Sequence, residues 1–384
     1  MRAGIVLRIS LLFLCMAPAP AFAEESRSDT GAWRYGGILD SAYAVDFNFP
    51  QENRWRSKTT TVQVNEPVLN MVMAYVRKVP TPGSRFGLEV GVQGGDDTEG
   101  LVPVSIPGRD KPLTGADSLR HVSRANVSYL APVGNGLTLT AGLFNSYIGY
   151  QSIYAKNNLN YTRSYMADNA PYFMFGLGAT YPINPSMQVG LYILNGYSYL
   201  SHINNQPSYG SQLVWTPTAR LTLTQNLYYG PDQSNTAIEF WRLFSGSIIE
   251  WKVWPLTLAV AYDIGTENAA ELSGHPRTFW TGGALYAHWN VHGPWSLALR
   301  PELYWDRNGR LTGSEQLLKA VTTTLEYKWT NTWRSALLRM EYRYDESTGI
   351  GGGFFSGRNL SLHVPGVARD QHLLLFSMIL AVTR

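Results

Sequence analysis

Charged side chains occur at alternate positions along three consecutive segments, 294–306, 315–329 and 333–345. Side chains at alternate positions of a β-strand share one face, so each segment would carry a row of charges. Including two earlier segments, the candidates are Glu250, Lys252, Asp263, Arg300, Glu302, Glu326, Lys328, Arg339, Glu341 and Arg343. Mixed charges in a water-filled pore orient water and tune ion preference. The pattern predicts that these residues line a pore; the alternative is that they only pair across strands and keep a wide interior solvated.

The opposite face of each segment is apolar. In 294–306 this face carries Trp295, Leu297, Leu299, Leu303 and Trp305. A soluble sandwich would hide such a face in a dry core, whereas an apolar outer face with aromatic ends and a charged inner face fits a membrane barrel around water. Thr324 would lie on the inner face, and we expect it to meet water. An open sheet edge in lipid would leave backbone groups unpaired, so the sheet should close.

Sixteen segments have suitable alternation, and a membrane-spanning strand needs roughly 9–11 residues. They are 36–48, 67–78, 84–95, 119–131, 136–146, 172–182, 186–196, 207–216, 219–230, 238–253, 255–265, 277–290, 294–306, 315–329, 333–345 and 371–382. Short links alternate with long polar segments at 49–66, 96–118, 147–171, 197–206, 231–237, 266–276, 307–314 and 346–370. Short periplasmic turns and long extracellular loops are typical of outer-membrane barrels. The sequence predicts an all-β fold, a transmembrane antiparallel up-and-down β-barrel of about 16 strands, with 14 or 18 as alternatives.

The long segment 147–171 is dense in Tyr, Asn and Ser. By analogy with general porins, a long polar loop beside a barrel mouth can fold inward and narrow the lumen. The candidates for such a constriction are Tyr150, Lys156, Asn157, Asn158, Asn160, Arg163 and Asp168. We expect Arg163 to pair with an inner-wall carboxylate such as Glu302 or Glu326. The alternative is an ordinary surface loop.

Other kinds of chemistry find little support. The seven histidines include no pair with the spacing of a metal site on one strand, so we predict no metal and no cofactor. The segment 349–353 is rich in Gly but lacks the strand–turn–helix setting of a phosphate-binding loop. No spacing selects a Ser, a His and an Asp or Asn for a hydrolase. We therefore expect no enzyme, and a barrel enzyme or a plugged structural barrel stays as the alternative function.

The N-terminus carries the pattern of a secretory signal peptide, predicted over 1–23. Arg2 and Arg8 flank the start of an apolar stretch, and Ala21-Phe22-Ala23 offers a cleavage site before Glu24. Residues 24–384 would then form one barrel domain. Removing Arg2 and Arg8 leaves 29 of the 31 basic residues against 28 acidic ones, a balance that argues against nucleic acid as a partner. Cys15 is the only cysteine, so the mature chain would have no thiol chemistry.

Residues 141–231 resemble the OmpL-like β-barrel porin family of Gram-negative outer membranes. The resemblance is carried by Gly142, Phe144, Ile148-Gly149-Tyr150, Asn157-Asn158, Asn160-Tyr161-Thr162-Arg163-Ser164, Pro171, Gly176, Ala179-Thr180-Tyr181 and Asn195-Gly196. It covers about a quarter of the chain closely. The flanking hairpins resemble the family only in the spacing of their strands and turns. The resemblance implies a passive diffusion channel, with some members similar to sugar or oligosaccharide porins.

We therefore expect an outer-membrane porin that passes small hydrophilic solutes. Its partners would be outer-membrane lipid and the solutes, and a homotrimer is expected by analogy alone. Many outer-membrane barrels end on an aromatic residue, whereas this sequence ends Ala381-Val382-Thr383-Arg384. The alternation over 372–382 is intact, so this departure concerns recognition during assembly and not the fold.

Overall fold

The computed structural model describes residues 33–101, 119–197, 204, 206–233, 236–270, 274, 276–361 and 364–384. The expected signal peptide, 1–23, lies outside the described residues. Over the described ranges, no helix combines the length and the apolar character that crossing a membrane requires.

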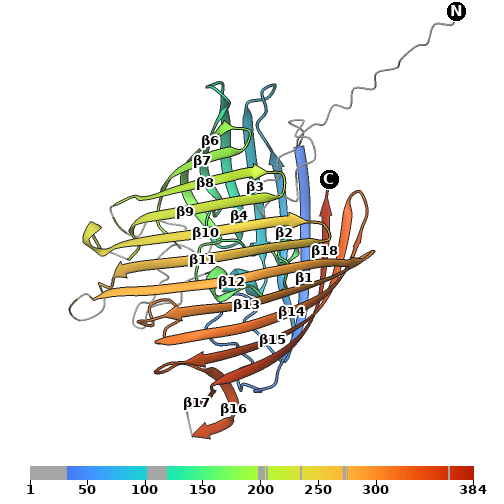
Figure 1. Ribbon diagram of the computed structural model, residues 1–384, viewed down its shortest axis with the longest axis vertical. Coiled ribbons are helices and arrows are strands. Elements are labelled where there is room, and N and C mark those ends of the chain that lie inside the picture. Colours follow the sequence, from blue (N-terminus) through green and yellow to red (C-terminus); the bar gives the residue numbers. More distant parts are fainter. Residues whose placement is uncertain are drawn as a thin grey trace, which may run out of the picture.

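Sixteen antiparallel strands form a closed barrel (Figure 1). Each strand from β1 to β14 pairs with the next one in the chain, and β18 closes the barrel between β15 and β1. The closing pair β1–β18 is in register from Gly36 opposite Thr383 to Asp46 opposite Leu373. Closure pairs the strand edges, as a sheet in lipid requires. The predicted fold class is confirmed.

The barrel strands coincide with the sixteen predicted segments. Their bounds are β1 Trp33–Asp46, β2 Pro67–Lys78, β3 Phe86–Gly94, β4 Val122–Ala131, β5 Leu137–Asn145, β6 Phe173–Asn184, β7 Met187–Leu194, β8 Ser208–Thr218, β9 Leu221–Pro231, β10 Trp241–Val253, β11 Leu256–Asn268, β12 Arg277–His292, β13 Trp295–Asp306, β14 Gln316–Thr330, β15 Arg334–Thr348 and β18 Asp370–Thr383.

Smaller elements lie between the strands. They are α1 Asp96–Glu99, η1 Ala155–Asn157, α3 Tyr165–Asp168, η2 Ile238–Phe240 and the hairpin strands β16 Phe354–Ser361 and β17 Val364–Ala368. Two of them correct the sequence-based expectation. The segment 238–240 was predicted as strand and is a 3-10 turn, and the predicted loop 346–370 contains the β16–β17 hairpin.

The outer surface of the barrel is apolar and the inner surface is polar. On β13, Leu297, Leu299 and Leu303 are 38 to 54 % exposed, whereas the alternating Arg300 and Glu302 are 0 and 3 % exposed. This is the reverse of a soluble sheet and matches a barrel wall that faces lipid. Exposed tryptophans mark the short-turn ends of five strands; they are Trp215, Trp251, Trp289, Trp295 and Trp329. Indole rings favour the membrane–water interface, so these residues place one interface at this end.

Two glycines of the resemblance motif face each other across β5 and β6. Gly142 pairs with Gly176 and has a φ of +120°. A Cβ at Gly142 would lie 2.2 Å from the Ala125 carbonyl oxygen, and one at Gly176 would lie 2.1 Å from the Ile193 carbonyl oxygen. Only glycine fits at this point without moving the adjacent strands. Both glycines lie near the ends of β5 and β6 that flank the segment 147–171.

Candidate functional site: the barrel lumen

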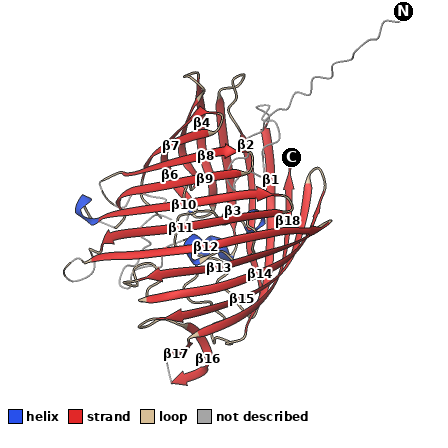
Figure 2. Cartoon of the chain, viewed as in Figure 1, coloured by secondary structure: helices blue, strands red, loops and turns tan. Residues whose placement is uncertain are grey.

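The segment 147–171 lies inside the barrel. In Figure 2 its helical turns are seen behind the wall strands, and α3 contacts β12 and β13. The Ser164 hydroxyl caps α3 by accepting from the Ala167 N–H at 3.1 Å. Asn158 and all residues from 160 to 168 are buried. A polar segment of this length can be buried only where its backbone groups find partners.

Carboxylates of the wall supply part of those partners. Glu341 on β15 accepts from the N–H groups of Tyr161 and Thr162 at 2.6 and 3.0 Å, and from the Thr162 hydroxyl at 2.5 Å. Glu302 on β13 accepts from the Tyr165 N–H at 2.7 Å. The segment is therefore fastened to the wall through its own N–H groups.

Arginines of the wall hold the carbonyl groups of the same segment. Arg300 donates to the Thr162 carbonyl at 2.6 Å, and Arg343 donates to the Arg163 carbonyl at 3.0 Å. Arg339 donates to the carbonyl groups of Ala155 and Asn158, both at 2.8 Å. Guanidinium groups suit this role because they present several donors in a fixed plane.

Inner-wall residues that we expected to meet water are thus covered by protein. Arg300, Glu302, Glu341 and Arg343 are at most 3 % exposed. Thr324 is 1 % exposed; it accepts from Asn160 at 2.8 Å and donates to Glu341 at 2.6 Å. The expectation that Thr324 meets water was wrong, because the inserted segment occupies the space in front of it.

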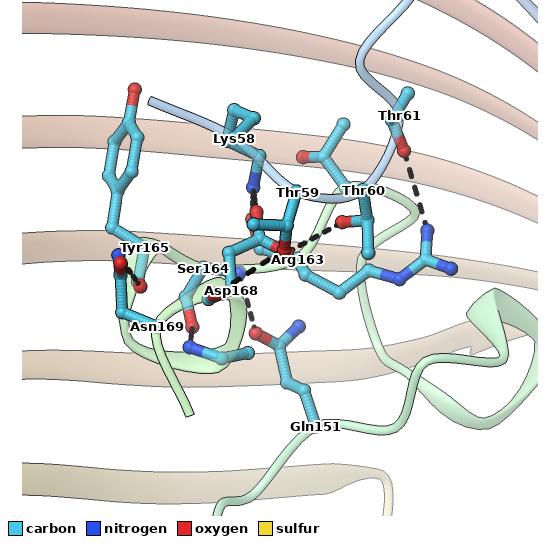
Figure 3. Close-up of polar contacts among 12 residues, drawn as sticks. Lys58, Thr59, Thr60, Thr61, Gln151, Arg163, Ser164, Tyr165, Asp168 and Asn169 are labelled. Atoms are coloured by element: carbon cyan, nitrogen blue, oxygen red, sulfur yellow. Dashed lines mark hydrogen bonds and ion pairs between the residues drawn. The ribbon is translucent and has the colours of Figure 1, made fainter. Parts of the chain in front are cut away.

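The segment 51–64, which joins β1 to β2, packs against 147–171 (Figure 3). Lys58 forms an ion pair with Asp168 and donates to the Arg163 carbonyl at 2.6 Å. The Thr60 hydroxyl donates to the same Asp168 carboxylate at 2.7 Å. Burial lowers the pKa of Lys58 to about 8 although Asp168 opposes this. Burial also disfavours the Asp168 carboxylate, but Lys58 and Thr60 outweigh it and lower the Asp168 pKa.

Arg163 does not pair with Glu302 or Glu326 as the sequence suggested. Its guanidinium lies 2.5 Å from the Asp97 carboxylate of α1, and both side chains are fully buried. Burial raises the pKa of Asp97, and Arg163 opposes this shift. The Thr61 N–H donates to the other Asp97 oxygen at 2.7 Å. Glu302 instead lies 3.2 Å from both Arg300 and Arg343, and Glu326 pairs with Arg339 at 2.6 Å.

Within the described part of the chain, the inserted segment borders a smaller and a larger cavity. The smaller, of about 240 Å³, is lined by β7 to β10 and by residues 145–150; the larger, of about 470 Å³, opens among the short-turn ends of β10 to β15. Tyr150 and Glu250 line both cavities. The Tyr150 hydroxyl donates to Glu250 at 2.8 Å, and Lys252 lies 2.8 Å from the other Glu250 oxygen. Burial raises the pKa of Tyr150, so this phenol keeps its proton.

The structure divides the predicted site residues into two groups. The larger cavity is lined by Glu250, Lys252, Glu326, Lys328, Arg339, Tyr150, Lys156, Asn157 and Asn158. The others line neither cavity and are buried in the wall or against the inserted segment; they are Asp263, Arg300, Glu302, Glu341, Arg343, Asn160, Arg163 and Asp168.

Sequence reasoning missed four residues that shape the lumen: Lys58, Asp97, Gln151 and Tyr286. Lys58 lies between β1 and β2 and Asp97 lies in α1 between β3 and β4, so both contact 147–171 from distant parts of the sequence. The run Lys58-Thr59-Thr60-Thr61 is a concentration of donors within a long loop, and that signal could have drawn attention to the segment. Tyr286 follows Leu285 on β12, so the alternation along this strand could have predicted that Tyr286 points inward. The centroid of its ring lies 4.7 Å from that of Tyr150.

Solved outer-membrane proteins share this fold. OmpT of Vibrio cholerae in its trimer form is 11 % identical, with a TM-score of 0.54 over 92 % of this chain and 99 % of that chain. The outer membrane channel DcaP of Acinetobacter baumannii is 8 % identical, with a TM-score of 0.55 over 92 % and 96 %. An anion-selective porin from Comamonas acidovorans is 9 % identical, with a TM-score of 0.55 over 91 % and 99 %. At these identities the likeness shows the fold alone.

No curated protein matches the sequence. The family model described as "Putative beta-barrel porin-2, OmpL-like" matches residues 33–382, which is nearly the whole barrel. The match confirms the resemblance noted over 141–231 and extends it to the flanking hairpins. The chain belongs to this OmpL-like family of outer-membrane β-barrel porins.

Proposed function

We propose that the protein is a porin that passes small hydrophilic solutes across the outer membrane by passive diffusion. Family membership supports an outer-membrane channel, and the solute class is our inference from the lumen. Polar side chains line both cavities. The route would run from the smaller cavity past Tyr150 and Glu250 into the larger one and leave among the short turns.

The contact between Tyr150 and Glu250 is the observation that carries this proposal. Both residues line both cavities, and one hydrogen bond between their side chains joins them. A contact of this kind opens more readily than the backbone-anchored part of 147–171, because only a hydrogen bond between two side chains must break and no backbone hydrogen bond. We propose that solutes pass here and that the buried residues 160–168 block the rest of the cross-section.

Planar-bilayer recording tests the proposal. The purified protein should give discrete single-channel steps, and Tyr150→Ala should enlarge them by removing the ring between the cavities. Tyr209→Ala is the matched control, since Tyr209 is 50 % exposed on the outer face. Equal conductance of Tyr150→Ala and the control would place the route elsewhere. Absence of steps in all three proteins would overturn the channel.

A plugged structural barrel is the second candidate, and the burial of the lumen favours it. Arg163, Arg300 and Arg343 are among the largest fully buried side chains, although they lie inside a barrel expected to hold water. Under this candidate the parent protein is silent in bilayers, and only deletion of Ala155 to Tyr161 produces conductance. The family and the similar solved structures favour a channel over an enzyme.

Three further parts of the function are proposals. Passage of sugars would appear as swelling of liposomes that contain the protein when a monosaccharide is the solute. A homotrimer is supported by the trimer form of Vibrio cholerae OmpT, and light scattering of the detergent-solubilised protein would test it. Removal of the signal peptide, 1–23, would place Glu24 at the N-terminus of the mature protein, which Edman sequencing can show.

A further inference from the structure

One level of the inner wall holds a row of residues from five neighbouring strands. Asn226 on β9 pairs with Gly246 on β10, and Gly246 pairs with Asp263 on β11. Asp263 in turn pairs with Gly282 on β12, which pairs with Tyr304 on β13. The register therefore places three buried polar residues on one row of the inner face, with a glycine between each two of them.

The two glycines of this row leave room for the neighbouring side chains. A Cβ at Gly246 would lie 2.8 Å from Asp263 Oδ1, so the carboxylate of Asp263 extends over Gly246. A Cβ at Gly282 would lie 2.7 Å from Tyr304 Cδ2, so the phenol ring of Tyr304 extends over Gly282. Both side chains thus lie along the row, where a larger residue at either glycine would displace them.

Asp263 brings a negative charge to this level without a counter-ion. The residue is 6 % exposed, and within the described part of the chain its carboxylate forms neither an ion pair nor a hydrogen bond. Arg242 is the arginine of β10 that faces inward above Gly246, and its charge is already used. It lies 2.6 Å from Asp232 and 2.8 Å from Glu267. A buried carboxylate is costly unless a cation compensates it.

Three neutral polar groups at this level also have no partner among the described residues. They are the amide nitrogen of Asn226 and the hydroxyl groups of Tyr197 and Tyr304, and each residue is at most 1 % exposed. Tyr197 follows β7, and its ring lies 5.4 Å from that of Phe244. Burial raises the pKa of Tyr197, and the Asp263 carboxylate raises it further, so the phenol lies in the field of that carboxylate. Buried polar groups normally have a partner, so their coincidence here indicates a ligand.

This level borders the smaller cavity on its outer side. Gln212 lines the cavity, pairs with Asn226 and donates to its side-chain oxygen at 3.0 Å. Ile248, which also lines the cavity, follows Gly246 by two positions toward the short-turn end of β10. In outer-membrane barrels the long loops face the outside. A solute that enters from that side would therefore meet the level of Asp263 before it reaches the smaller cavity.

We propose that this level binds the ammonium group of small organic amines and selects them as solutes. Asp263 supplies the negative charge, and the hydroxyl oxygens of Tyr197 and Tyr304 accept hydrogen bonds from the ammonium N–H groups. The rings of Tyr197 and Phe244 add aromatic faces, which attract cations. A hydroxyl oxygen elsewhere on the same solute would accept from the Asn226 amide. The proposal rests on the proposed function only in naming solutes of the route, since binding itself needs no conduction.

Isothermal titration of the detergent-solubilised protein with ethanolamine tests the site. The parent should bind ethanolamine saturably and bind ethylene glycol, its uncharged counterpart, far more weakly. Asp263→Asn keeps the shape but removes the charge, and should weaken ethanolamine binding by about tenfold or more. Glu346→Gln is the matched control, since it removes a carboxylate charge on the outer face. Equal affinities of Asp263→Asn and Glu346→Gln, equal binding of the two compounds, or no binding to the parent would overturn the proposal.

Tyr304→Phe provides a second variant that keeps the ring over Gly282 and removes only the hydroxyl group. It should bind ethanolamine about threefold more weakly, or less still, than the parent. An affinity equal to that of the parent would overturn the assigned role of Tyr304 even if Asp263→Asn failed to refold. A protein that binds ethanolamine but gives no bilayer conductance would keep the site and refute the channel. Conductance without ethanolamine binding would refute the site alone, so the two failures are distinguishable.

Discussion

Replacing Glu341 with Ala should release the inserted segment from the barrel wall. The Glu341 carboxylate accepts two backbone N–H groups, from Tyr161 and Thr162, and two hydroxyl groups, from Thr162 and Thr324. The residue is 1 % exposed, so water cannot replace it while the segment stays docked. Alanine would leave both N–H groups buried without an acceptor. The hydroxyl groups can turn to other acceptors, so they add less.

The expected magnitude follows from the two orphaned N–H groups. An unsatisfied buried donor costs about 1–3 kcal/mol, so docking of the segment should weaken by about 2–6 kcal/mol. Since 1.4 kcal/mol is a factor of ten, the undocked population should rise by about 30-fold or more. The barrel wall keeps its backbone pairing, because β14, β15 and β18 remain in register.

Hydrogen–deuterium exchange of peptides covering 155–168 measures this population. Exchange should accelerate in Glu341→Ala and stay unchanged in Glu346→Ala. Glu346 lies on the same strand but faces outward, where its pair with Arg369 is largely exposed and contributes little. Exchange rates that do not differ between the two variants would refute the reasoning, because Glu341 would then not hold the segment.

The remaining predictions concern the outer face, the buried ion pair and the inserted segment. Leu299→Arg should cost about 2–4 kcal/mol in refolding into lipid vesicles, and Thr257→Arg, which lines the larger cavity, should cost clearly less. Equal costs would argue against a lipid-facing wall. Lys58→Met should destabilise the protein by about 3–5 kcal/mol in urea unfolding, because Asp168 is left buried without its counter-ion. Lys58→Met/Asp168→Leu should recover most of this loss, and failure to recover would show that the pair itself is not the cause. Deleting Ala155 to Tyr161 should enlarge conductance and admit larger sugars in liposome swelling; parental values would mean that these residues do not limit passage.

The barrel was predictable because its signal is local. Within about ten residues, the alternation of apolar and polar side chains shows which face of a strand is outward and which is inward, as Leu297, Leu299 and Arg300 illustrate on β13. The hairpin β16–β17 was not predicted, because the whole segment 346–370 was assigned to a loop.

The interior of the barrel was not predictable to the same depth, because its contacts join residues far apart in the sequence. Lys58 meets Asp168 and Arg163 meets Asp97, and no periodicity links the members of either pair. The expected partners of Arg163 were plausible by charge, but Glu302 and Glu326 already lie beside arginines of the wall. The sequence therefore identified the residues of the inner face without showing which of them lie beside open space and which beside protein.

The central claim is that residues 147–171 occupy the lumen of the membrane-inserted barrel. Cross-linking of Asn160→Cys/Thr324→Cys with a short bis-thiosulfonate reagent tests it most directly, since these side chains are 2.8 Å apart and Cys15, the only cysteine, lies in the expected signal peptide. Gln225→Cys/Ser247→Cys, a pair bonded at 2.6 Å between β9 and β10, is the positive control. The account predicts that both pairs cross-link in protein reconstituted in vesicles. Cross-linking of the control pair alone would contradict it.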